Sequence, residues 1–166
     1  MSKAFPSASL TFWTLLGGAL AAAGSSALNQ YIDRELDKNM QRTAKRPLAD
    51  GRLTNAEGLA FGLALSLMSY YVLACFVNGL AALLSLAGII YYVILYSLWL
   101  KKATVQNIVI GGGAGAIPPM VGYAAATGHL DWTAWILFAI IFMWTPPHFW
   151  ALAIVRMKDY ERAGVP

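Results

Sequence analysis

The sequence predicts an all-α protein that forms a polytopic bundle of transmembrane helices. Of its 166 residues, 58% are hydrophobic and 12% are charged, about half the charged share of a typical soluble domain. The mean hydropathy is +0.57, and apolar stretches of roughly 20 residues, the length that crosses a bilayer, recur along the chain. The cations gather in a few segments between these stretches, so we interpret the net charge of +4 as a property of membrane loops rather than of a nucleic-acid surface.

Five membrane spans are expected in order. They cover residues 10–28, 58–77, 80–100, 105–126 and 132–154. The first is rich in Gly and Ala, whose small side chains let helices approach closely in lipid. Asn78-Gly79 predicts a tight turn between the second and third spans. Pro47 is expected to break the helix that carries the first charged segment, and Pro146-Pro147 to interrupt the fifth span. Cys75 lies inside an apolar span, where a buried packing role is expected.

The distribution of Lys and Arg orients these spans. Segments 29–57, 101–104 and 155–166 carry 11 of the 12 basic residues, and only Lys3 falls on the other side. The positive-inside rule therefore places the three segments in the cytoplasm. We treat residues 1–166 as one membrane domain in which 29–57 form a cytoplasmic, Asp-rich loop or helix.

The first charged segment is the strongest candidate for a functional site, because charges near lipid are costly to keep. In a helix, Asn29, Asp33 and Asp37 fall at i, i+4 and i+8 and share one face. Two carboxylates and an amide oxygen are hard-oxygen donors that suit Mg2+. Three basic residues follow: Arg42, Lys45 and Arg46. Such cations bind diphosphates. The alternative, a solvated loop of mixed charge, remains open at this point.

Two further motifs have competing interpretations. Gly111 to Gly115 lacks the spacing of a dinucleotide-binding or P-loop motif, so close helix packing is favoured over nucleotide binding. His148 follows the second proline pair at membrane depth, where it is either a satisfied core residue or a ligand. A cation permease is disfavoured, because no acidic residue falls at mid-membrane depth.

Four stretches together resemble the UbiA-type intramembrane prenyltransferase family, and within it the members that farnesylate protoheme IX (heme O synthases). They are Asn29 to Arg52, Gly111 to Pro119, Trp144 to Leu152 and Asp159 to Pro166. The resemblance covers the chain from about Gly17 onward. It implies transfer of a farnesyl group from farnesyl diphosphate to a vinyl group of heme b, with Mg2+ as cofactor. Another aromatic acceptor, such as a quinone precursor or a chlorophyll-like ring, and an inactive truncated bundle are the alternatives.

Carried over by position, the resemblance assigns roles to individual residues. The implied metal ligands are Asn29, Asp33, Asp37 and Asp159. The implied catalytic residues are Asp33, Asp37, Arg42 and Arg46. The implied substrate-binding residues are Asn29, Lys45, Arg52, His148 and Asp159, with His148 on the heme side. The resemblance also implies a bacterial cytoplasmic membrane, or a mitochondrial inner membrane in a eukaryote, and heme A synthase or a terminal oxidase assembly as candidate partners.

The chain departs from this family in two respects. The region that matches the family's second Asp-rich motif offers only Asp159 and Glu161 for a second metal ion. Family members have about nine membrane helices, whereas about five are expected here. We therefore expect a partial domain that lacks the first helix and the helices after Val165-Pro166.

Overall fold

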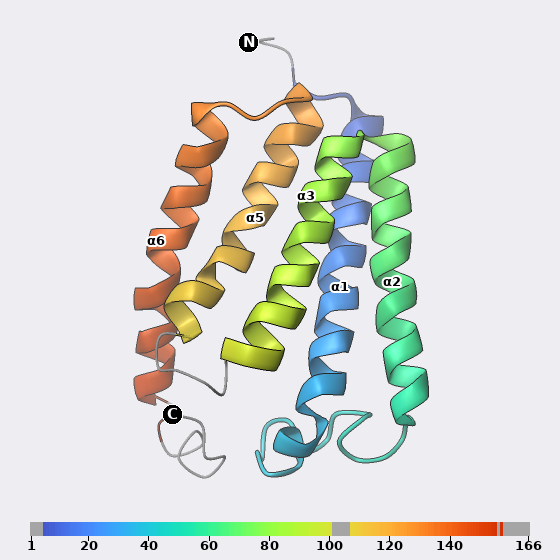
Figure 1. Cartoon of the computed structure of the whole chain (residues 1–166), viewed down its shortest axis with the longest axis vertical. Coiled ribbons are helices and arrows are strands. Elements are labelled where there is room, and N and C mark those ends of the chain that lie inside the picture. Colours follow the sequence, from blue (N-terminus) through green and yellow to red (C-terminus); the bar gives the residue numbers. More distant parts are fainter. Residues whose placement is uncertain (1–4, 101–106, 156, 158–166) are drawn as a thin grey trace.

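The fold described here is that of a computed structural model, which describes residues 5–100, 107–155 and 157 (Figure 1). Helices are the only regular secondary structure in this part of the chain. They are α1 (Ala8–Lys38), α2 (Asn55–Phe76), α3 (Gly79–Ile90), η1 (Tyr91–Leu100), α5 (Asn107–Thr127) and α6 (Trp132–Val155). With η1 counted as the continuation of α3, five of these helices are long and apolar enough to cross a membrane. The predicted fold class and the five expected spans are therefore confirmed.

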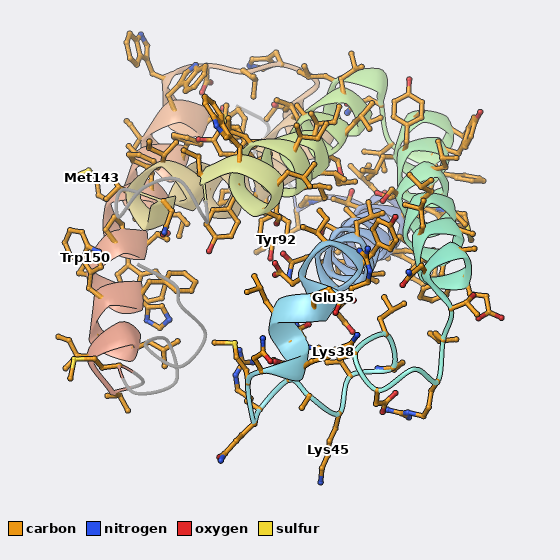
Figure 2. The ribbon with its side chains drawn as sticks, turned by 60° about the horizontal axis from the view of Figure 1, so that its bottom comes forward. Glu35, Lys38, Lys45, Tyr92, Met143 and Trp150 are labelled. Atoms are coloured by element: carbon orange, nitrogen blue, oxygen red, sulfur yellow. The ribbon has the colours of Figure 1, made fainter. Side chains whose placement is uncertain are left out.

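Consecutive helices run in opposite directions and lie side by side (Figure 1). Each packs against the next along the chain, and α1 additionally contacts α3, η1 and α5. Viewed from the end that carries the loop after α1, helices α6, α5, α3 and α2 follow an arc with α1 on its inner side (Figure 2). The C-terminal end of α1, the loop to α2 and the C-terminal end of α6 lie at this same end of the bundle (Figure 1). Of the three charged segments, the structure describes the first, which lies at the same end of the bundle as the C-terminal end of α6.

Small residues hold α1 against α2. A Cβ at Gly24 would lie 2.6 Å from Ser66 Oγ and 2.8 Å from the Ser66 backbone nitrogen. The Ser69 hydroxyl crosses the interface and donates a 2.8 Å hydrogen bond to the Gly17 carbonyl oxygen. In lipid, helix association depends on such close packing and interhelical hydrogen bonds, because lipid tails are as apolar as the helix surface. The expected role of the small residues in the first span is confirmed.

The glycines of α5 receive the aromatic side chains of η1. A Cβ at Gly111 would overlap the Tyr96 ring, and one at Gly113 would lie 3.0 Å from the Tyr91 hydroxyl oxygen. On its other side α5 meets α6, where a Cβ at Gly112 would lie 3.1 Å from Thr145 Cγ2. The close-packing interpretation of this glycine run is therefore confirmed for its first three members.

The apolar core lies at the other end of the bundle, away from the loop between α1 and α2. It consists of Leu73, Ala81, Ala82, Val121, Ala124 and Ala125. Asn78 closes this end as the N-cap of α3: its side chain accepts a 2.8 Å hydrogen bond from the Ala81 N–H and donates one of 2.9 Å to the Ala124 carbonyl oxygen. The predicted Asn78-Gly79 turn thus joins α2 to α3 and ties both to α5.

Three local expectations were wrong. α1 continues through the acidic residues and ends at Lys38, well before Pro47, because Asn39 caps it and the chain then enters a series of turns. α6 runs unbroken through Pro146-Pro147, since unwinding within a bilayer would leave more backbone groups unpaired than the two missing N–H donors do. Cys75 is exposed, because apolar side chains of a membrane bundle can also face lipid.

We predict that Gly24→Ala will destabilise the protein by about 1–3 kcal/mol. The added methyl meets backbone atoms of α2, which cannot rotate out of the way. Gly18→Ala is the matched control, because a Cβ there would have no atom of another helix within 4 Å. This variant should leave stability unchanged or raise it by about 0.5–1 kcal/mol. Unfolding in detergent measures both. Equal effects of the two variants would contradict the packing described for α1 and α2.

Candidate functional site

The acidic face, by which we mean Asn29, Asp33 and Asp37, occupies one side of the last turns of α1. The helix extends through all three positions, so the predicted i, i+4, i+8 alignment is realised. Both carboxylates are withdrawn from the surface: Asp33 is 1% exposed and Asp37 is 4% exposed. Burying carboxylates is unfavourable unless cations or hydrogen-bond donors compensate. The buried acidic face is therefore a specific arrangement, and the interpretation as a freely solvated charged loop does not hold for it.

Arg46 supplies the cation for Asp37. Its Nη1 lies 2.7 Å from Asp37 Oδ2. The loop that carries Arg46 folds back beneath α1, and the fully buried Thr43 fixes it there by donating a 3.1 Å hydrogen bond to the Asp37 backbone oxygen. The Arg46 N–H in turn donates to the Thr43 carbonyl oxygen at 2.9 Å. A sequence of turns after α1 thus brings a guanidinium back to the acidic face.

The η1 segment provides the other wall of the site. Tyr92 projects from η1 toward α1 (Figure 2), and its hydroxyl lies close enough to Asp33 and Arg46 for both charges to act on it. Ser97, also on η1 and fully buried, places its Oγ 2.8 Å from Asn29 Oδ1. Sequence reasoning missed Tyr92, Ser97 and Thr43, because polar side chains in and beside an apolar span carry no local signal of what they contact.

Three of the four predicted basic residues are exposed rather than buried with the acidic face. Arg42 and Lys45 are exposed, and Lys45 points away from α1 (Figure 2). Arg52 turns back on its own loop, pairing with Asp50 at 2.7 Å and donating to the Lys45 carbonyl oxygen at 2.8 Å. Partial desolvation opposes ionisation of Asp50, but the Arg52 N–H and guanidinium outweigh it and hold the pKa of that carboxyl below its usual value. The roles of Arg42, Lys45 and Arg52 stay predictions.

The opposite side of α1 carries a different set of charges. Glu35 and Lys38 pair at 2.8 Å and are largely exposed (Figure 2). They line an open hollow of about 550 Å3 together with the loop from Leu48 to Asn55. Because this hollow excludes Asp33 and Asp37, it is distinct from the acidic face. Glu35 is therefore a suitable control residue, because it is a carboxylate on the same helix that is exposed rather than buried.

His148 lies apart from the acidic face. It is exposed on α6, where its ring stacks on Trp144 with centroids 4.4 Å apart and meets the edge of Phe149 at 5.5 Å. Among the described elements α6 packs against α5 alone. If His148 binds heme, the heme would therefore lie in a different part of the bundle from the carboxylates. Asp159 and Glu161 lie outside the described residues.

The donors of the acidic face fit a magnesium ion. Mg2+ is commonly held by one or two carboxylates, with waters and substrate phosphate oxygens completing an octahedron. Two aspartates and an amide oxygen on adjacent turns match that pattern. The described residues contain no cluster of three His, Cys, Asp or Glu side chains, so the fit is to an ion that shares its ligands with a substrate rather than to a protein-enclosed metal.

We predict that Arg46→Gln will destabilise the protein by about 1–3 kcal/mol in the absence of metal. This is less than the cost of breaking a fully buried pair, because the Arg46 side chain is 29% exposed. Arg52→Gln removes a pair of the same 2.7 Å length whose arginine is 65% exposed, and it should have little effect. Urea unfolding in detergent with EDTA measures both variants. A larger loss in Arg52→Gln would show that the Asp37–Arg46 pair does not anchor the loop.

Comparison with known proteins places the chain in a family. The UbiA prenyltransferase family matches residues 1–166. Proteins named protoheme IX farnesyltransferase are similar: that of Roseiflexus sp. (strain RS-1) is 56% identical over 97% of this chain and 30% of its own length, and that of Synechococcus sp. (strain JA-3-3Ab) is 58% identical over 92% and 46%. The protein of that name in Symbiobacterium thermophilum is 54% identical over 97% of this chain and 54% of its own length.

The chain thus spans about half, or less, of the length of these relatives. No solved structure gives a significant match. The matched family covers the whole bundle, including the helix that carries the acidic face and the η1 segment that faces it. This chain belongs to the UbiA prenyltransferase family.

Proposed function

We propose that this chain provides the diphosphate-binding part of a prenyltransferase that joins the farnesyl group of farnesyl diphosphate to a vinyl group of heme b, giving heme O. The observation that carries the proposal is the buried acidic face with Arg46, in a chain 54–58% identical to proteins named protoheme IX farnesyltransferase. The proposed setting is a bacterial cytoplasmic membrane, with the acidic face at the cytoplasmic end of the bundle.

Asn29, Asp33 and Asp37 would hold Mg2+ against the diphosphate. The ion, when bound, neutralises the negative charge that develops on the leaving diphosphate oxygens. Arg46 contributes to the same task from the loop side, since its guanidinium presents several N–H donors in a fork that matches phosphate oxygens. Its pairing with Asp37 keeps it oriented at the site before a diphosphate arrives, so little reorganisation is needed when one binds.

Aromatic rings beside the carboxylates favour ionisation of an allylic diphosphate. Tyr92 and Tyr96 stack with centroids 5.6 Å apart and planes 25° from parallel, and Tyr92 lies within electrostatic reach of Asp33. The faces of such rings attract cations, so this pair can stabilise a farnesyl cation as its diphosphate departs. An apolar surround keeps water from competing with the vinyl carbon for that cation.

The first test is incubation of the chain in lipid nanodiscs with heme b, farnesyl diphosphate and Mg2+. Mass spectrometry would detect a heme heavier by one farnesyl group plus water. In parallel, equilibrium binding of inorganic pyrophosphate would be followed with Mg2+ and with EDTA. We expect Mg2+-dependent binding in the wild type, and its loss in Asp33→Asn and in Asp37→Asn, because each removes a negatively charged ligand while keeping the side-chain shape.

Glu35→Gln is the matched control, since it removes a carboxylate from the exposed side of the same helix. It should bind pyrophosphate as the wild type does. Unchanged binding in both aspartate variants would contradict the assignment of the acidic face. Mg2+-dependent prenylation of an acceptor other than heme b would retain the diphosphate site and overturn the proposed acceptor.

A further inference from the structure

The η1 segment has an unusual hydrogen-bonding register, which the side-chain hydrogen bond of Ser97 reflects. Elsewhere in the helices, five Ser and Thr hydroxyls donate to the carbonyl oxygen four residues earlier. These pairs are Thr14–Leu10, Ser25–Ala21, Ser66–Gly62, Thr127–Tyr123 and Thr145–Ile141, at 2.7–2.8 Å. Ser97 instead reaches the carbonyl oxygen of Tyr92, five residues earlier, at 3.0 Å. The difference follows from the π-helical geometry of η1, whose hydrogen bonds run from i to i+5.

This register directs Ser97 at the acidic face. In an α-helix, residues four apart share a face, whereas the wider turn of η1 puts residues five apart together. Ser97 therefore lies on the same side as Tyr92, the side that faces α1, and its Oγ is 2.8 Å from the Asn29 side chain. Helices with wide turns are rare and recur at functional sites. Here the wide turn brings a buried hydroxyl to a residue of the acidic face.

The hydrogen-bonding capacity of Ser97 then fixes which way the Asn29 amide points. The hydroxyl has two neighbouring oxygens, Tyr92 O and Asn29 Oδ1, but only one proton to donate. The two ends of an asparagine amide are exchanged by a 180° rotation that leaves its shape unchanged. With the amide rotated, Asn29 Nδ2 donates to Ser97 Oγ, and the Ser97 proton goes to the Tyr92 carbonyl oxygen. Each group then has a partner of the right kind.

We propose that Ser97 is a positioning residue that holds the Asn29 amide with its nitrogen toward η1 and its oxygen available on the acidic face. This proposal rests on the proposed function, because it gives the oxygen a purpose: an amide oxygen is a ligand for a divalent cation, and an N–H2 group is not. Ser97 acts through Asn29 and touches neither the ion nor the diphosphate. In other metal sites, groups that hydrogen-bond to a metal ligand orient it in the same way.

The competing interpretation is purely structural: Ser97 could serve only to satisfy the Tyr92 carbonyl within η1. That role predicts a loss of stability on removal of the hydroxyl and no change in Mg2+ dependence. The positioning role predicts a change in Mg2+ dependence that is conditional on the residue at position 29. The two interpretations are separated by measuring both quantities in the same variants.

The experiment measures the Mg2+ concentration that gives half-maximal binding of inorganic pyrophosphate to the chain in nanodiscs. Ser97→Ala should raise this concentration about ten-fold, the lower end of the effect of removing a group that orients a ligand. Ser66→Ala is the matched control, because it removes a buried hydroxyl that bonds only within its own helix. It should leave the Mg2+ dependence unchanged.

The decisive comparison uses Asn29→Asp. A carboxylate presents an oxygen whichever way it rotates, so it needs no positioning by Ser97. Adding Ser97→Ala to Asn29→Asp should therefore change the half-maximal Mg2+ concentration by less than about two-fold. A ten-fold effect of Ser97→Ala in both backgrounds, or no effect in either, would overturn the proposal. If the wild type binds pyrophosphate without Mg2+ dependence, or if Asp33→Asn leaves that dependence intact, the proposed function itself has failed.

A variant that does not fold would be recognised by its thermal unfolding in EDTA. In that case the variant is replaced by an NMR measurement on the wild-type chain, in which asparagine is labelled with 13C and 15N. The Asn29 side-chain resonances are identified by their disappearance in Asn29→Asp. On addition of Mg2+ and pyrophosphate, the proposal expects the Asn29 Cγ signal to shift while the Nδ2 protons keep a hydrogen-bonded position. A shift of the Nδ2 protons with no change at Cγ would overturn it.

Discussion

Burial of two carboxylates at the end of a membrane helix is the constraint on which the rest of this structure depends. Asp33 and Asp37 are almost entirely enclosed, and enclosed charge is unfavourable without compensation. The loop after α1 folds back so that Arg46 reaches Asp37 and Thr43 reaches the helix end. The path of this loop, including the exposed positions of Arg42 and Lys45, follows from that need.

The bundle keeps the acidic face enclosed by packing small residues on either side of it. Gly24 and Ser69 fix α1 against α2, and the glycines of α5 fit around the aromatic side chains of η1. In both interfaces, residues with little or no side chain allow the neighbouring helices to approach closely. As a result, α1 and η1 face each other, with Asn29 in contact with Ser97 and Tyr92 within electrostatic reach of Asp33.

The two halves of the proposed reaction occupy different parts of the chain. The groups suited to a diphosphate gather around the end of α1, whereas the aromatic cluster around His148 is exposed on α6, a helix that packs on α5. The curated relatives extend well beyond the length matched here. An acceptor as large as heme would have to approach a farnesyl group held at the acidic face from a direction that other parts of such a protein help to define.

The sequence by itself determined the fold class, the five spans and the spacing of Asn29, Asp33 and Asp37. These depend on hydrophobic length and helical period, which are local properties of the chain. Only the tertiary structure decided that, of the basic residues after α1, Arg46 is the one that meets Asp37, and that Tyr92 and Ser97 complete the site. The Ser97–Asn29 contact joins segments 68 residues apart, and the Arg46–Asp37 contact spans nine residues of helix end and irregular turns. They depend on how a loop closes and on the wide turn of η1, neither of which is encoded by residue type at any single position.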